Sequence, residues 1–127
     1  MTALAQGRYL ADAVATASPA RLVTMLYDRL MRDLEQGEAA LRRGEAAAAG
    51  QALGHAQEIV LELRASLQVD VWEGGPRLAA LYSWVLGELM KANMKGDVRR
   101  VRDCRQVVEP LRDAWREAAA SLAAGGS

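Results

Sequence analysis

A seven-residue spacing of apolar residues near the C-terminus most constrains what this chain can fold into. Apolar residues recur at the first and fourth positions of successive heptads: Val101, Cys104, Val108, Leu111, Trp115, Ala118 and Leu122. This spacing is typical of a helix that packs at a shallow angle against its neighbours in a bundle. Pro110 lies inside the pattern, and an interior proline costs about 3 kcal/mol. We therefore expect a kink just before Pro110, or a break with Pro110 as a new first helical residue.

The remainder of the chain predicts three further helices. Aromatic residues make up only 5 % of the chain, and the apolar fraction consists mostly of Ala, Leu and Val, which favours helix. Ser18-Pro19 is a helix-start signal, Gly44 is a stop signal, and Asp97 can cap the last helix. The predicted helices span residues 18–43, 45–67, 76–94 and 98–122.

Four long amphipathic helices with short connections predict an all-α fold, an antiparallel four-helix bundle. We expect the bundle to occupy residues 18–122, followed by a flexible tail over residues 123–127. Residues 1–17 hold too few apolar side chains for a core helix and are predicted to form a short N-terminal cap segment.

Two of the predicted helices carry more apolar surface than a bundle helix needs. Helix 45–67 confines its apolar residues to about a third of its circumference, whereas helices 18–43 and 76–94 spread theirs over about half or more. One interpretation is a wide core contact with scattered exposed apolar side chains. The other is a groove for a partner segment, covered by the cap segment when no partner is bound.

Composition argues against several classes of function. Sixteen basic residues balance sixteen acidic ones, so the basic excess typical of a nucleic-acid binder is missing. With one histidine, His55, and one cysteine, Cys104, the chain offers neither a di-metal motif nor a disulfide framework. We expect Cys104 to be buried and inert, and His55 to be exposed or partly buried. No catalytic motif is recognisable, so we predict no enzyme, no metal and no cofactor.

Membrane and secretion signals are also missing from the sequence. No stretch approaches roughly 18 uninterrupted apolar residues, and the first residues do not resemble a signal peptide. We expect a soluble protein without membrane association. The arginine-rich run over residues 99–105 is read as a solvated helix face, with an acidic partner as the alternative.

Three stretches resemble the FliS family of flagellar secretion chaperones. Thr16-Ala-Ser-Pro, Leu22 and Met25-Leu-Tyr-Asp match the opening signature of that family. Ala56-Gln, with Glu62-Leu and Ser66-Leu, resembles its second helix, and Leu81-Tyr, with Ala92-Asn and Asp97, resembles its third. The resemblance covers nearly the whole chain in the right order. His55 departs from the family, where a lysine is commoner.

The resemblance implies a cytoplasmic chaperone without an ATP cycle. Members of the family bind the disordered C-terminal segment of flagellin, prevent its premature polymerisation and help to deliver it to the export apparatus. Further partners implied are export-apparatus or regulatory proteins, and the chain is expected to be a monomer or a weak homodimer. The alternative is a self-associating helical bundle that acts as an adaptor or structural protein.

The resemblance and the wide apolar faces together suggest which residues bind the partner. Our hypothesis is a groove lined by Leu81, Tyr82, Val85, Leu89 and Trp115, with Leu22, Met25 and Leu26 as second-rank candidates. Each of these eight residues has plain core packing as its alternative role. Tyr9 and Leu10 are predicted to cap the groove until flagellin binds.

Overall fold

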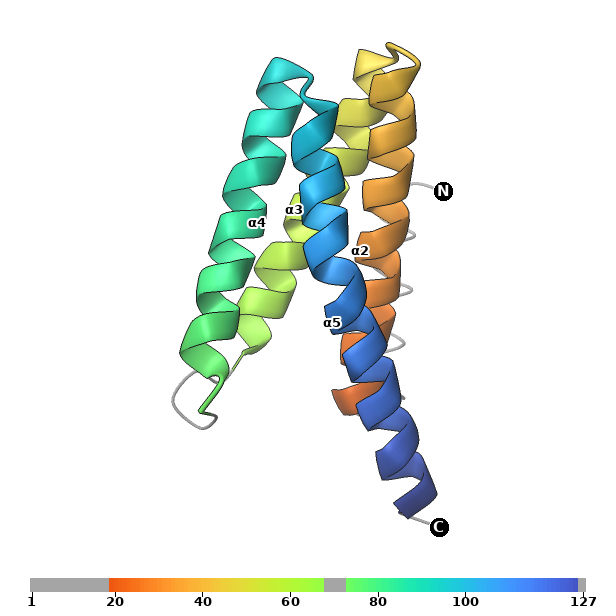
Figure 1. The fold of residues 1–127 in the computed structure, drawn as a ribbon, viewed down its shortest axis with the longest axis vertical. Coiled ribbons are helices and arrows are strands. Elements are labelled where there is room, and N and C mark those ends of the chain that lie inside the picture. The colour runs from red at the N-terminus through yellow and green to blue at the C-terminus, as the bar shows by residue number, and fades with distance from the viewer. Residues whose placement is uncertain (1–18, 68–72, 126–127) are drawn as a thin grey trace.

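The computed structural model describes residues 19–67 and 73–125, and all of its regular structure is helical. Its helices are α2 (Pro19–Arg42), α3 (Ala46–Ser66), α4 (Gly75–Lys95) and α5 (Val98–Gly125). They run antiparallel to one another in chain order (Figure 1). α2 packs on α3 and α5, and α4 packs on the same two helices, so α2 and α4 lie diagonally opposite. The predicted all-α four-helix bundle is confirmed.

Two glycines make the tight turns that reverse the chain. Gly44 (φ 71°) and Gly96 (φ 64°) adopt the left-handed conformation that glycine tolerates best. The carboxylate of Asp97 then accepts a hydrogen bond from the backbone N–H of Arg99 at 3.1 Å and so caps α5, as predicted. Pro19 is the first residue of α2, also as predicted, whereas Ser18 lies outside the described residues.

α5 runs through Pro110 as one helix, so of the two alternatives predicted at this proline the break is wrong. Figure 1 shows that the axis of α5 changes direction about midway and that its second half leans away from α4. The helix also ends at Gly125, three residues later than the expected Leu122. The result is a long final helix whose two halves have different neighbours.

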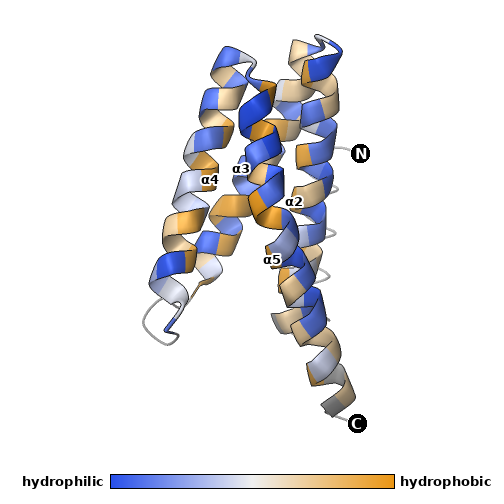
Figure 2. Cartoon of the chain, in the orientation of Figure 1, coloured by the Kyte–Doolittle hydropathy of each residue, from blue (hydrophilic) through white to orange (hydrophobic). Residues whose placement is uncertain are grey.

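The core lies between the four apolar stripes, and hydrophobic and hydrophilic residues alternate along each helix (Figure 2). Tyr27, Leu34, Leu53 and Leu89 are among its fully buried side chains. Cys104 is also fully buried, and its thiol donates a long hydrogen bond of 3.9 Å to the carbonyl oxygen of Val85. Burial raises the pKa of the Cys104 thiol to about 12, which disfavours the reactive thiolate, and the expected burial of this residue is confirmed.

Within the described ranges 19–67 and 73–125, none of the helices combines the length and the hydropathy that crossing a membrane requires.

Candidate partner-binding surface

One end of the bundle leaves apolar side chains only partly covered. This is the end at which α2 and α4 begin and α3 ends, and we call it the open end. Eight hydrophobic residues are partly buried and pack against the core, and six of them lie at or near this end. These six are Leu22, Val23, Leu67, Leu81, Leu111 and Trp115. Incomplete coverage of large apolar side chains marks a surface that can bind a partner.

The open end arises because α5 is longer than the helix beside it. Arg100 of α5 bonds Glu88 of α4 at 2.8 Å, and α4 begins thirteen residues before Glu88, at Gly75. The antiparallel register therefore places Gly75 level with about Asp113 of α5. Beyond that level α5 has α2 on one side and no α4 on the other, and Figure 1 shows its C-terminal end extending past the other helices.

The burial of the heptad residues of α5 changes along the helix as its neighbours change. Val101, Cys104 and Val108 are buried as the spacing predicts. Trp115, further along, is only partly buried, and Leu122 is 67 % exposed. The prediction of a continuous core seam is thus correct for the first half of α5 and wrong for its last turns. The physical reason is that an apolar stripe is buried only where a neighbouring helix exists to cover it.

Three aromatic side chains from three helices form the floor of the open end. The hydroxyl groups of Tyr27 on α2 and Tyr82 on α4 are hydrogen-bonded at 2.7 Å, across the diagonal of the bundle. The ring of Trp115 on α5 lies 6.4 Å from that of Tyr27, centroid to centroid. Burial raises the pKa of both phenols, so each stays neutral and one hydroxyl donates to the other.

An ion pair borders this floor on the α2–α5 side. Arg116 donates a hydrogen bond from its guanidinium to the carboxylate of Asp28 at 2.7 Å, and both side chains are about half exposed. Exposed pairs of this kind contribute little to stability, typically about 0–1 kcal/mol. The rim of the open end is therefore polar and easily rearranged, whereas its floor is apolar.

The predicted binding residues divide into two groups. Leu26, Tyr82, Val85 and Leu89 are buried in the core, where a partner cannot touch them without movement of the helices. Leu22, Met25, Leu81 and Trp115 are partly buried. Leu22, Leu81 and Trp115 pack against the core at the open end. Tyr9 and Leu10 lie outside the described residues.

Leu111 and Leu122 were not among the predicted binding residues, although both belong to the heptad pattern. The missing signal was helix length, because α5 has 28 residues and α4 only 21. An apolar stripe on the longer of two neighbouring helices must extend past its partner, and this comparison would have placed the free part of the stripe at the C-terminal end of α5.

Besides the ion pair of Asp28 and Arg116, a polar cluster lies between α2 and α3. The ring Nδ1 of His55 is hydrogen-bonded to the carboxylate of the buried Asp33, and Arg29 approaches the same carboxylate at 3.4 Å. Burial raises the pKa of Asp33, and the contact with His55 opposes that rise. His55 is partly buried, as expected. Within residues 19–67 and 73–125, no three His, Cys, Asp or Glu side chains are grouped so as to hold a metal ion.

Known proteins with similar sequences and structures agree with this architecture. The family described as "Flagellar protein FliS" matches residues 1–122. The flagellar secretion chaperone FliS of Escherichia coli strain K12 is 32 % identical over 108 residues, which covers 84 % of this chain and 79 % of the relative. The flagellar secretion chaperone FliS of Vibrio cholerae is 30 % identical over 105 residues, or 80 % of this chain and 76 % of the relative.

A solved structure described as a flagellar chaperone from bacteria has the same fold. It superimposes with a TM-score of 0.74 over 93 % of this chain and 97 % of its own, at 22 % sequence identity. At that identity the likeness supports the fold, whereas the sequence matches carry the family. Since the family match spans nearly all of the chain, the protein belongs to the FliS family of flagellar secretion chaperones.

Proposed function

We propose that this chain binds the disordered C-terminal segment of flagellin at the open end, keeps it from polymerising prematurely in the cytoplasm and assists its export. The observation that carries the proposal is the apolar seam of α5, which continues past the start of α4 and leaves Leu122 67 % exposed. Membership in a family of flagellar secretion chaperones supplies the class of client.

The chemistry of such a client suits this surface. A segment that later packs inside a filament presents an apolar face, and as a helix it can lie in an apolar groove. Leu22, Met25, Leu81 and Trp115 make the contacts in this proposal, while the buried Tyr82, Val85, Leu89 and Leu26 support them from beneath. Tyr9 and Leu10 cap the surface until the client arrives.

Binding a disordered segment has a thermodynamic signature. The segment loses conformational entropy as it orders, so a large apolar area must be buried to give useful affinity. That burial produces a strongly negative heat-capacity change, which a purely polar contact would not give. Occupying the apolar face of the client also removes the surface through which it would polymerise.

Calorimetric titration with the C-terminal segment of flagellin from the same organism tests the proposal. We expect one-to-one binding with a strongly negative heat-capacity change. No heat of binding up to about 100 μM of the segment would contradict the proposal, because the free energy would then be weaker than about −5.5 kcal/mol. Light scattering that showed a stable homodimer of the free chain would favour the self-associating bundle instead.

A pair of variants locates the binding site. Leu122→Asp places a charge on the exposed seam of α5, whereas Leu61→Asp places one on α3, where Leu61 is 48 % exposed. Both should leave the melting temperature nearly unchanged, because neither residue is in the core. We expect a loss of affinity of at least tenfold for Leu122→Asp alone. Equal effects of the two variants would show that the client lies elsewhere.

A further inference from the structure

The outer face of α4 carries large hydrophobic side chains that the open end does not use. Trp84, Met90 and Met94 are 42 %, 50 % and 82 % exposed. They are three of the five large hydrophobic residues that are exposed within the described ranges, and α4 is the only helix to hold more than one. The buried residues Tyr82, Val85 and Leu89 occupy the opposite side of the same helix. Such a concentration on one helix indicates an interaction surface.

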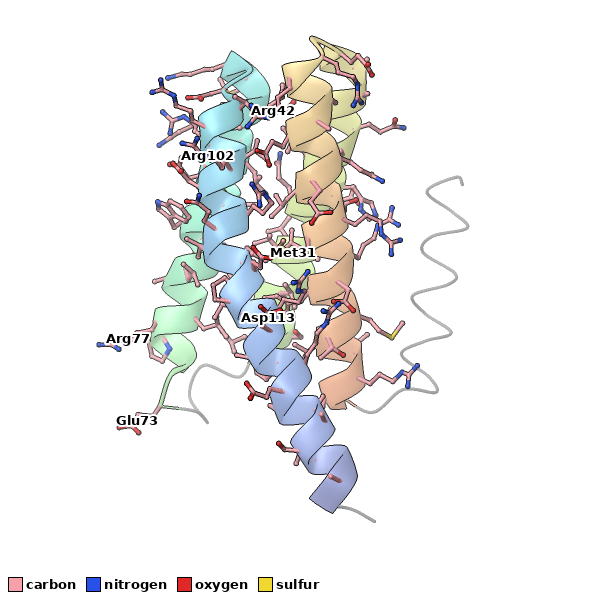
Figure 3. The ribbon with its side chains drawn as sticks, turned by 45° about the vertical axis from the view of Figure 1, so that its right-hand side comes forward. Met31, Arg42, Glu73, Arg77, Arg102 and Asp113 are labelled. Carbon is pink, nitrogen blue, oxygen red and sulfur yellow. The ribbon has the colours of Figure 1, made fainter. Side chains whose placement is uncertain are left out.

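The charged groups around this face are cationic. α4 contains Arg77, Lys91 and Lys95 but only one acidic residue, Glu88, whose side chain is 14 % exposed. Arg100 bonds the Glu88 carboxylate at 2.8 Å, and Lys91 lies 3.8 Å from it. Figure 3 shows Arg77 pointing away from the other helices.

The start of α5 adds to the same charge. The carboxylate of Asp97 accepts a hydrogen bond from the backbone N–H of Arg99 and lies 3.2 Å from the guanidinium of Arg100. Its negative charge is therefore already paired. In residues 19–67 and 73–125, no carboxylate forms an ion pair with Lys95 or Arg99. The surface thus combines exposed methionine and tryptophan with positive charge that is not neutralised locally.

Gly87 leaves a gap between the larger side chains of this face. It lies one helical turn from Trp84, Met90 and Lys91. A Cβ atom added at Gly87 would meet nothing within 4 Å, so the backbone is open to solvent at this point. A partner backbone can therefore approach α4 closely between the larger side chains, and methionine adapts readily to the surface laid against it.

We propose that the outer face of α4 docks an amphipathic helix of a partner protein, with an apolar stripe flanked by carboxylates. Charge complementarity selects this occupant, because the stripe contacts Trp84, Met90 and Met94 while the carboxylates meet Lys95 and Arg99. A second copy of this chain fits poorly, since a two-fold interface would bring two cationic faces together. This inference goes beyond the proposed client site, because it assigns a second, separate surface.

A synthetic helical peptide tests the inference directly. The probe is about 20 residues long, to match the length of α4, and has leucine along one face and glutamate along both flanks. Its control carries lysine in place of every glutamate. We expect fluorescence anisotropy to show a dissociation constant of about 10–100 μM for the acidic peptide and at least tenfold weaker binding for the basic one. Equal binding of the two peptides, or none, would overturn the proposal.

Two variants with a matched control place the peptide on α4. Gly87→Gln fills the gap without a clash and removes a helix-weakening glycine, so it should raise the melting temperature and yet weaken binding at least tenfold. Lys95→Glu should weaken binding by a similar factor. Arg64→Glu is the control, because Arg64 is likewise an exposed cation in the last turn of its helix. If Arg64→Glu weakened binding as much as Lys95→Glu, the site would not be on α4.

Two further measurements sharpen the assignment. One distinguishes this surface from the client site, and the other distinguishes a partner helix from a membrane as its occupant. Leu122→Asp should bind the acidic peptide as tightly as the unmodified chain, so the result does not depend on whether flagellin binds the open end. Vesicles containing phosphatidylserine should not bind the chain. Vesicle binding that Gly87→Gln and Lys95→Glu abolish, in the absence of peptide binding, would replace the helix with a membrane and overturn the proposal.

Discussion

The two ends of the bundle are built from different side chains and hold their helices together in different ways. At the end with the glycine turns, which we call the closed end, alanines at positions 40, 49 and 92 are buried where the helices meet. Gly37 allows α2 and α3 to approach so closely that an added Cβ would lie 2.6 Å from the side chain of Leu53. At the open end larger side chains lie between the helices, among them Tyr27, Tyr82 and Trp115. Small residues let helices pack closely, whereas large residues need a neighbour on every side.

Polar groups strengthen this contrast. At the closed end the largely buried Glu38 accepts hydrogen bonds from Arg42 and Arg105, each at 2.9 Å, and so ties α2 to α5. At the open end the corresponding tie is the exposed pair of Asp28 and Arg116. The close helix contact and the buried ion pair are thus found at the closed end, whereas the open end presents an incompletely buried apolar surface.

Truncating a leucine to alanine should give the largest difference between the two ends in the free energy of unfolding that is lost. Leu89→Ala empties a fully buried site and should lower the free energy of unfolding by about 3 kcal/mol. Leu81→Ala removes a partly exposed side chain at the open end and should cost about 1 kcal/mol. Urea denaturation measures both. Similar losses would show that the open end is packed as well as the closed end.

The tyrosine pair beneath the open end should behave as one unit. Tyr27→Phe and Tyr82→Phe each leave a buried hydroxyl without its partner, so each should cost about 1–2 kcal/mol. The double variant removes both hydroxyls and should cost clearly less than the sum of the two. A double-mutant cycle in urea measures the coupling. Strict additivity would show that the hydrogen bond does not link α2 to α4.

The Glu38 ion pairs should make the closed end sensitive to acid. Burial tends to raise the pKa of Glu38, but hydrogen bonds and positive charge from Arg42 and Arg105 outweigh it and lower that pKa below the usual 4.5. The stabilisation is therefore complete above about pH 4.5 and is lost as the pH falls through the lower, folded-state value.

Glu38→Gln measures this stabilisation. We expect the variant to be about 1 kcal/mol less stable than the unmodified chain at pH 7, with a deficit that shrinks as the pH falls below 4.5. Glu62→Gln, at an exposed position on α3, serves as the control and should change little at either pH. A deficit of constant size down to pH 3 would show that the carboxylate charge does not hold α2 to α5.

The smallest change in stability is expected when the ion pair at the rim of the open end is broken. Arg116→Gln breaks an ion pair whose side chains are 53 % and 40 % exposed, so the free energy of unfolding should change by less than about 0.5 kcal/mol. Thermal melts at low and at high salt measure it. A loss as large as that of Glu38→Gln would mean that the open end is held as firmly as the closed end.

Much of the fold could be predicted because its signals are local. Gly44 follows the end of α2 as the sequence indicated, and Asp97 caps α5 through a contact two residues away. The buried face of α3 also follows its narrow apolar stripe. Pro110 was predicted to kink or to break its helix, and α5 passes through it as one helix whose axis changes direction about midway.

The candidate site could be predicted only in outline. Trp115 and Leu81 lie at the open end, but Val85 and Leu89 of the same predicted set are core residues. The apolar stripes of α2 and α4 are wide, so helical periodicity could not tell which part of each stripe faces the bundle axis. The exposed Trp84, Met90 and Met94 were not among the predicted binding residues, although helical spacing places all three on the face of α4 opposite its buried residues.

The sequence by itself determined the class of fold, the positions of the turns and the family, since each depends on the order of residues along one chain. Only the tertiary structure decided which apolar residues remain accessible. Burial is a property of neighbours, and whether Leu122 or Val101 has a helix against it depends on where α4 begins relative to α5. The same heptad pattern therefore forms the core at one end of α5 and an open surface at the other.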